Sequence, residues 1–202
     1  PPVDREPGIF AAAVLERFPD TPVEHEGRLT NLRIRDAYLT RIFAFADLRR
    51  VGRGRAGGAM AALVDFQARQ KLTLMAHSPR LQRELGRIVA NPERRPFEEV
   101  FADYRRLFRE ALSTDPGPGT HQNVIQHAQG YFKEGLSARE KGHFGELLVD
   151  YRAGKVGRGA LLALVQSWIR RFDEGYLARQ SYLNPYPREL LDLADSGGSG
   201  RL

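Results

Sequence analysis

The chain has 202 residues, a formal net charge of +6 and 31 basic residues, of which only four are lysine. Cysteine is absent, which excludes disulfides, thiolate metal ligands, a cysteine nucleophile and a cysteine-held iron–sulfur cluster within these residues. No apolar run approaches the roughly 18 residues that span a membrane, so we expect no membrane contact and a cytoplasmic location. The basic excess suits a polyanionic partner, although arginine codons of a GC-rich genome would produce it too.

Helical periodicity runs through the sequence, and no segment alternates apolar and polar residues as a strand would. The predicted fold is therefore all-α, a single compact multi-helix bundle with a short N-terminal connector. Turn-forming residues mark the breaks between helices, as at Ser78-Pro79 and in the Asp-Pro-Gly-Pro-Gly run at 115–119. The predicted helices span 8–18, 33–51, 57–77, 79–91, 96–113, 120–135, 137–153, 158–173 and 175–182.

The composition divides the chain into three parts. Residues 1–31 are marked by prolines and read as a connector, residues 32–193 as the helical domain, and residues 194–202 as a flexible tail rich in glycine and serine. Within the helical domain, the Gly/Arg segment 52–58 reads as a linker, with loose phosphate contacts as the alternative. It lacks the ending of a phosphate-binding loop and does not follow a strand.

The predicted helix at 120–135 has two contrasting faces. At about 100° per residue, one side gathers apolar residues and the other gathers neutral amides, a glycine and a lysine. Amides form directional hydrogen bonds, and glycine lets another surface approach the backbone, so this polar side is typical of a contact surface. The apolar side holds Val124, Ile125, Ala128, Tyr131 and Phe132, whereas the polar side holds Gln122, Asn123, Gln126, Gly130 and Lys133, with His127 at its edge.

Three polar residues interrupt the apolar stripes of two earlier helices. Arg41 projects into the stripe of the helix at 33–51, and Gln67 and Lys71 project into that of the helix at 57–77. Long side chains can run along a core and reach water at their ends. The alternative is that the three residues line one basic groove with the polar side of the helix at 120–135. There cations would hold phosphates while amides contact riboses or base edges.

The histidines and the C-terminal tyrosines are further candidates for a functional role. The histidine spacings match no metal motif, so we expect no metal site. His77 stands at a helix end, where a histidine usually meets carbonyl groups, although His77 and His127 could also act as acid–base groups. Tyr176, Tyr182 and Tyr186 accompany Arg179; they either stack on bases or pin the terminal segment to the bundle, and we favour pinning.

The sequence resembles the YbgA-like family, a helical domain of unknown function, over residues 31 to 193. The most specific match is the motif His-x-Asn-Val-x-Gln-His-x-x-Gly-Tyr-Phe-Lys at 121–133. Further matching runs lie at 31–45, 71–78, 150–154 and 180–187. The sequence departs from the family at Gln67 and Gln70, where histidines are common, and a binding role tolerates this change better than a catalytic one.

The resemblance implies a partner and a substrate. Family members occur alone or behind a thiouracil-desulfidase-like domain, and residues 8–29 are similar to the end of that domain. In the fused proteins the implied activity is removal of sulfur from 4-thiouridine in tRNA, with the YbgA-like domain gripping the tRNA. This chain lacks the cysteines of the desulfidase domain, so we do not expect it to be an enzyme alone or to carry a cofactor.

We therefore expect an RNA-binding module that positions tRNA for a desulfidase domain in cis or in trans. The alternatives are an independent enzyme that uses His77 and His127 on a nucleotide-derived substrate, and a purely structural or oligomerisation module. The expected RNA-binding residues are Arg41, Gln67, Lys71, His77, Asn123, Gln126, His127, Lys133 and Arg179.

Overall fold

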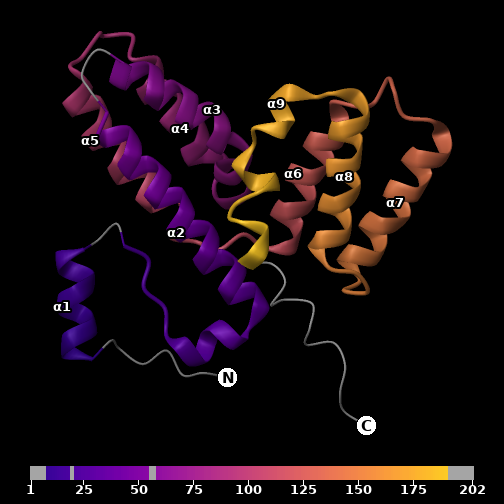
Figure 1. Cartoon of the computed structure of the whole chain (residues 1–202), viewed down its shortest axis with the longest axis horizontal. Coiled ribbons are helices and arrows are strands. Elements are labelled where there is room, and N and C mark those ends of the chain that lie inside the picture. Colours follow the sequence, from indigo (N-terminus) through magenta and orange to yellow (C-terminus); the bar gives the residue numbers. More distant parts are fainter. Residues whose placement is uncertain (1–7, 19–20, 55–57, 191–202) are drawn as a thin grey trace. The chain divides into compact units, whose positions relative to one another are not determined.

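The computed structural model describes residues 8–18, 21–54 and 58–190 (Figure 1). The regular elements of these ranges are all helical, which confirms the all-α prediction. The helices are α1 Ile9–Arg17, α2 Leu32–Gly52, α3 Ala59–His77, α4 Pro79–Ala90, α5 Phe97–Ala111, α6 Pro118–Gly130, α7 Ala138–Arg152, α8 Arg158–Phe172 and α9 Gly175–Ala178, with short 3₁₀ turns at Glu26–Thr30 (η1), Ser181–Leu183 (η3) and Arg188–Leu190 (η4).

The chain divides into two compact units. One comprises Pro1–Arg50 with Tyr186–Leu202, and the other comprises Val51–Pro185. The division falls inside α2. The predicted tail at 194–202 and the centre of the predicted Gly/Arg linker lie outside the described residues.

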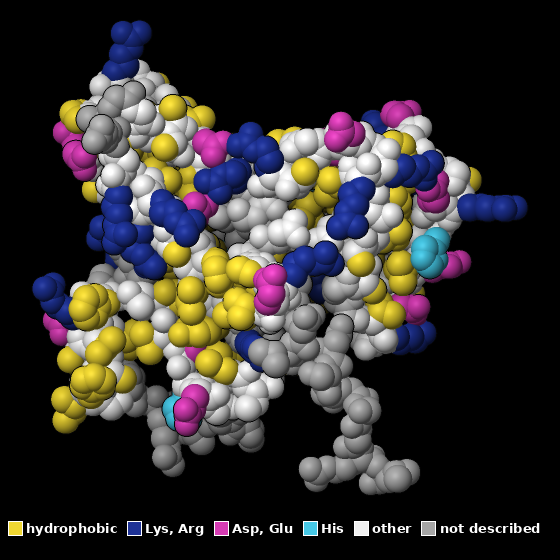
Figure 2. All heavy atoms as spheres, viewed as in Figure 1, with side chains coloured by type: hydrophobic (Ala, Val, Ile, Leu, Met, Phe, Trp, Pro, Cys, Tyr) yellow, Lys and Arg dark blue, Asp and Glu magenta, His cyan; other side chains and the backbone are white. Residues whose placement is uncertain are grey.

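Helix α1 of the first unit buries none of its residues. Ile9 is 94% exposed and Phe10 is 84% exposed, and hydrophobic atoms cover the visible surface over α1 in Figure 2. Elsewhere in this unit Tyr186 is buried. Its hydroxyl donates a hydrogen bond to Asp36 Oδ1 at 2.7 Å, and its ring lies 6.4 Å from that of Phe43. Tyr186 therefore pins the segment after residue 185 to α2, as we favoured from the sequence.

Local signals in the second unit set the helix boundaries. Ser78 accepts a hydrogen bond from the Leu81 N–H and Pro79 occupies the first turn of α4, as expected for a helix start. Ser137 and Glu140 form a capping box at the start of α7. The predicted helix at 120–135 instead starts at Pro118 and ends at Gly130, after which the chain makes a turn.

Helix α3 lies at the centre of the second unit. It packs against α4, α5, α6 and η3, so it buries residues around most of its circumference (Figure 1). On one side Phe66 lies among Tyr104 and Phe108 of α5, with ring centroids 6.0 and 5.3 Å away. On the other side, α3 contributes Leu72 and Ala76 to the core formed with α6, α7, α8 and η3.

The core between α6, α7 and α8 is built around Trp168. The Trp168 ring lies 5.9 Å from that of Phe132 and 5.5 Å from that of Phe144. Val124, Ile125, Ala128 and Phe132 of the predicted apolar face are buried. Tyr131 differs, because its side chain is 43% exposed.

A buried glutamine fastens the C-terminal segment of this unit to α3. The Leu72 N–H donates to Gln180 Oε1 at 3.2 Å, and Gln180 Nε2 donates to the Ala68 carbonyl at 2.8 Å. In a regular helix these two backbone groups bond to each other, four residues apart. The Gln180 amide thus inserts beside the backbone ladder of α3 and fixes the chain just after α9.

Candidate nucleic-acid interface

The polar side of α6 faces solvent, as its pattern predicts. Asn123, Gln126 and His127 are exposed, and they recur at three- and four-residue spacing, which places them on one face of the helix. Near its end a Cβ built on Gly130 would meet no atom within 4 Å, so the space outside this glycine is open. The backbone of α6 can therefore be approached closely here.

An aromatic pair continues this face beyond the end of α6. The ring of Tyr131 stacks on that of Tyr176 at the start of α9, with centroids 5.5 Å apart and planes 16° apart. The imidazole of His127 meets Tyr131 edge-on at 5.8 Å. Burial raises the pKa of the Tyr176 hydroxyl, and Tyr131 adds to the rise, so this phenol stays neutral in ordinary buffers.

We use the name α6 surface for this exposed polar face and the aromatic pair that extends it. Lys133 lies in the turn that follows α6 and is well exposed, with a long contact of 3.7 Å to Glu134. An exposed pair of this length contributes little to stability, so the ammonium group is accessible to an anion. The α6 surface consists of Asn123, Gln126, His127, Gly130, Tyr131, Lys133 and Tyr176.

Gln67 does not belong to this surface. It is only 8% exposed, its Oε1 accepts a hydrogen bond from the Tyr104 hydroxyl at 2.6 Å, and its Nε2 donates to the Gln82 carbonyl at 3.4 Å. Burial raises the pKa of Tyr104 well above its ordinary value. The polar residue that interrupts the stripe of α3 is therefore a satisfied core amide, and we remove it from the proposed RNA contacts.

The other predicted site residues on α3 are half-buried. Nδ1 of His77 lies 2.7 Å from the Thr114 carbonyl oxygen. Because a carbonyl can only accept, Nδ1 carries the proton in this contact. The bond fastens the end of α3 to the loop before α6, in line with the end-capping interpretation. Lys71 stands between the buried residues Gln70 and Leu72 and is itself only partly covered.

The two predicted arginines have different surroundings. Arg41 is half-buried on α2 and belongs to the first unit, whereas the residues of the α6 surface belong to the second. Arg179 is exposed beside Gln180 and forms an ion pair with Asp65 of α3. Asp65 also accepts from Arg69 Nε at 2.8 Å. Hydrogen bonding by Arg69, followed by that of Arg179, lowers the pKa of Asp65, while desolvation opposes this shift.

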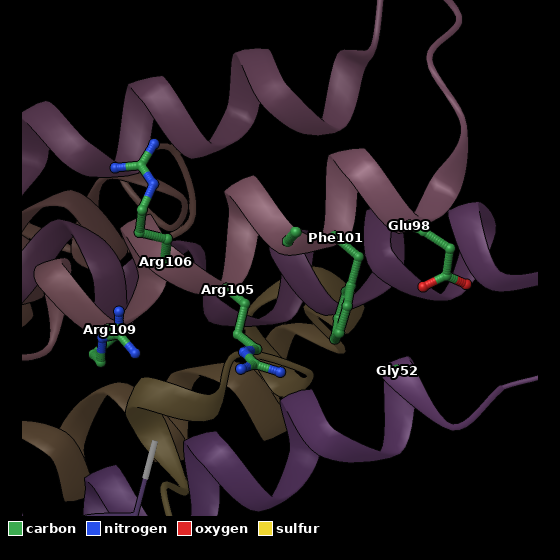
Figure 3. A pocket seen from close by; sticks show the side chains of 7 residues that line it. Gly52, Glu98, Phe101, Arg105, Arg106 and Arg109 are labelled. Carbon is green, nitrogen blue, oxygen red and sulfur yellow. The ribbon is translucent and has the colours of Figure 1, made fainter. Parts of the chain in front are cut away.

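A second polar region, which we name the α5 pocket, was not predicted from the sequence (Figure 3). It has a volume of about 480 Å³ and is lined by three arginines of α5, Arg105, Arg106 and Arg109, together with Glu98, Phe101, Ala102 and Gly52. In Figure 3 the side chains of Phe101 and Arg105 point to the same side of α5. The pattern Arg-Arg-x-x-Arg at 105–109 is the feature of the sequence that could have indicated this cluster of arginines.

A third cluster joins the starts of α6 and α8. Nδ1 of His121 lies 2.9 Å from the Tyr182 hydroxyl, and the guanidinium of Arg158 lies 3.2 Å from His121 Nε2 and 5.7 Å from the centre of the Tyr182 ring. Tyr182 is buried, so it anchors the segment after α9 as Tyr186 anchors the next one. We assign this cluster a packing role.

The described residues hold no group of three or more metal-ligating side chains that could bind an ion. Within the same ranges, no helix is long and apolar enough to cross a membrane.

Comparison with known proteins identifies the family. A family described as protein of unknown function (DUF1722) matches residues 71–187, from the middle of α3 to the segment after η3. The uncharacterized protein YbgA of Escherichia coli (strain K12) is 31% identical over 166 residues, covering 82% of this chain and 96% of that protein. No solved structure matches the chain. The protein therefore belongs to the DUF1722 family of YbgA-like proteins.

Proposed function

We propose that this chain binds RNA, and tRNA in particular, through the α6 surface, and that it positions the tRNA for a desulfidase domain acting on 4-thiouridine. The observation that carries the proposal is the exposed Tyr131 ring, stacked on Tyr176 and in contact with His127, beyond the end of a helix whose solvent face carries neutral amides. Flat aromatic faces stack on unpaired bases, and amides bond to riboses or base edges. The combination suits single-stranded or looped RNA better than a DNA duplex.

Charge supports the same proposal in a secondary way. The net charge of +6 favours association with a polyanion at low salt. The accessible ammonium of Lys133 and the partly covered Lys71 supply phosphate contacts, while Asn123 and Gln126 supply the directional ones. Neither histidine of the enzyme alternative is assigned a chemical step, because His77 is bonded to a backbone carbonyl and the imidazole of His127 packs edge-on against Tyr131.

Helix α1 offers a contact surface for the desulfidase domain that the proposed function requires. Its exposed Ile9 and Phe10 form an apolar surface of the kind that protein contacts cover. We propose that the desulfidase domain, in cis or in trans, packs against this helix. The chain itself contributes binding and no sulfur chemistry, since it has no cysteine.

The direct test is an electrophoretic shift with bulk tRNA and with duplex DNA, at about 50 mM and about 200 mM salt. We expect tRNA to bind more tightly than the duplex at both salt concentrations, with weaker binding at the higher one. Equal affinity for both polymers would reduce the proposal to non-specific charge attraction, and absence of tRNA binding at low salt would overturn it.

A second measurement addresses the role in desulfuration. A desulfidase domain supplied in trans is assayed for sulfur release from tRNA that contains 4-thiouridine, with and without this chain. We expect the KM for tRNA to fall when the chain is present while kcat changes little, because positioning raises the local concentration of substrate. An unchanged KM would mean that RNA binding by this chain does not assist desulfuration.

A further inference from the structure

The Tyr176 hydroxyl is buried and has no hydrogen-bond partner within the part of the chain that the structure describes. The neighbouring Tyr131 helps to raise the pKa of Tyr176, but the two hydroxyl groups do not meet in hydrogen-bonding geometry. A hydroxyl that leaves water without gaining a partner destabilises the folded state. Its position on the α6 surface indicates that the partner comes from outside the chain.

The location of this hydroxyl distinguishes it from other unpartnered groups. Gln70 and Thr73 of α3 also have side-chain oxygens without a partner, but both residues are only 2% exposed and lie within the bundle. Tyr176 is half-buried, and Tyr131, whose ring stacks on it, is 43% exposed. Tyr131 is thus the outer member of the pair, and a ligand that displaces its ring reaches the hydroxyl of Tyr176.

The two rings differ in how firmly they are held. The Tyr176 N–H donates to Glu174 Oε1 at 3.1 Å, its side chain packs against the core of α6, α7 and α8, and the following Leu177 is fully buried. Tyr131 follows Gly130, outside which the space is open, and stands in the turn after α6. Exposed side chains exchange rotamers within nanoseconds. Tyr131 can therefore rotate away from Tyr176 while the fold stays intact.

The rings must separate for a base to enter between them. Their centroids are 5.5 Å apart, whereas two stacking contacts of about 3.5 Å each need about 7 Å. Separation breaks one stack and the edge contact between Tyr131 and His127, whereas insertion of a base forms two new stacks. The bound state therefore has more stacking than the closed pair, and the Tyr176 hydroxyl becomes accessible in the same step.

We propose that Tyr131 and Tyr176 form a clamp that opens to hold one unpaired nucleotide between their rings, and that the Tyr176 hydroxyl bonds to a polar atom of this nucleotide. The inference rests on the proposed function of the α6 surface and names the group that this surface selects. A phenolic hydroxyl both donates and accepts. Its partner is either the ribose 2′-hydroxyl or the edge of the base, and the same opening reaches both.

The main test compares two substitutions that each remove one phenolic hydroxyl, Tyr176→Phe and its matched control Tyr131→Phe. Fluorescence anisotropy measures binding of a short oligouridylate, which stays single-stranded. Tyr176→Phe should weaken this binding about three- to tenfold, because one hydrogen bond is lost. It should also raise the urea midpoint, because the hydroxyl that it removes has no partner in the free protein. Tyr131→Phe should leave both quantities near those of the wild type.

The 2′-deoxy counterpart of the oligouridylate distinguishes the two partners. If the hydroxyl bonds to the ribose, Tyr176→Phe weakens binding of the RNA strand alone. If it bonds to the base, binding of both strands weakens equally. Either result supports the clamp, because a residue that only packs would not lose affinity while the protein gains stability.

Photo-oxidation measures the opening itself, because it couples adjacent tyrosine rings to fluorescent dityrosine. Saturating oligouridylate should lower the yield from Tyr131 and Tyr176, with Tyr131→Phe as the blank. An unchanged yield, or unchanged affinity of Tyr176→Phe for both strands, would overturn the clamp. If Tyr131→Ala weakens binding while Tyr176→Phe does not, the α6 surface still binds RNA and only this inference fails. Absence of oligouridylate binding by the wild-type chain would contradict both proposals.

Discussion

The α6 surface and the α5 pocket lie in the same unit but obtain their polarity in opposite ways. The α6 surface combines neutral amides with an exposed aromatic pair and a single lysine at its end. The α5 pocket places three arginines around one phenylalanine. Phosphate contacts position a nucleic acid, whereas contacts with bases carry the information on sequence and strandedness. A search of the surface for clustered charge would therefore find the α5 pocket and miss the α6 surface.

The two regions also differ in how closely a partner can approach the backbone. At Gly130 on the α6 surface a Cβ would meet no atom within 4 Å, so the missing side chain leaves space for something outside the chain. At Gly52 the missing side chain is filled from within, because the ring of Phe101 occupies that space. Gly130 thus leaves room for a partner and Gly52 leaves room for the Phe101 ring, although both glycines stand at the end of a helix.

Replacement of Tyr131 with alanine should produce the largest change in RNA affinity. Stacking of a base on an aromatic side chain contributes about 1–3 kcal/mol, so single-stranded RNA should bind about 5- to 150-fold more weakly. The loss should appear in fluorescence anisotropy at every salt concentration. The salt slope should stay unchanged because no phosphate contact is removed.

Tyr131→Phe is the matched control for that variant. It keeps the aromatic face and the stack on Tyr176 but removes the hydroxyl, so affinity should remain near that of the wild type. If phenylalanine weakens binding as much as alanine does, the ring face is not the contact. If the alanine variant binds normally, the α6 surface is not the RNA site.

Substitution of the two glycines by alanine should change the stability of the protein in opposite directions. A methyl group at residue 52 would overlap the Phe101 ring, which is itself held against Phe97, and overpacking of this kind costs about 1–3 kcal/mol. Gly130→Ala adds a methyl group to open space at the end of α6 and should stabilise the protein by up to about 1 kcal/mol. Urea unfolding measures both effects, and a neutral Gly52→Ala variant would mean that the pocket wall adjusts freely.

The helices of this protein could be predicted well because each signal is local. Pro79 after Ser78 marks a helix start by the backbone chemistry of proline, and the structure places α4 accordingly. Both ends of the helix predicted at 120–135 were misplaced, because α6 already starts at Pro118, inside the predicted loop, and ends at Gly130. The chain turns after Gly130 while Phe132 still reaches the core, so the apolar pattern continues past the helix.

The site was harder to predict, because burial depends on which helices surround a residue. Val64 and Gln67 both lie on α3, yet Val64 is 50% exposed and Gln67 is buried against Tyr104. A helix packed on several sides has no single apolar stripe, so its periodicity is weak. Tyr131 was assigned to the apolar face because the helix was predicted to continue to residue 135, whereas Tyr131 lies in the turn after α6. Its stacking on Tyr176 joins residues 45 positions apart, which sequence spacing cannot show.

Removal of single lysines should test the contribution of charge to RNA binding, with a smaller effect than Tyr131→Ala. Lys133→Ala and Lys71→Ala should each lower the salt slope of tRNA binding by about one unit, since each removes one phosphate contact. Lys155→Ala is the control, because Lys155 is exposed but lies 3.2 Å from Asp150 on α7. Slopes that fall equally for all three lysines would indicate that no particular surface is involved.

The smallest effect should come from Asp65, which forms an ion pair with Arg179. Its pKa is lowered first by the Arg69 hydrogen bond, so its stabilising effect is present above the ordinary carboxyl value of about 3.9 and is lost as pH falls through the lowered pKa. Asp65→Asn should therefore reduce the urea midpoint slightly at neutral pH and not at the acidic end. It also frees Arg179 for phosphate, so tRNA should bind slightly more tightly to the variant at low salt. A variant with lower stability but unchanged tRNA affinity would assign Arg179 to packing alone.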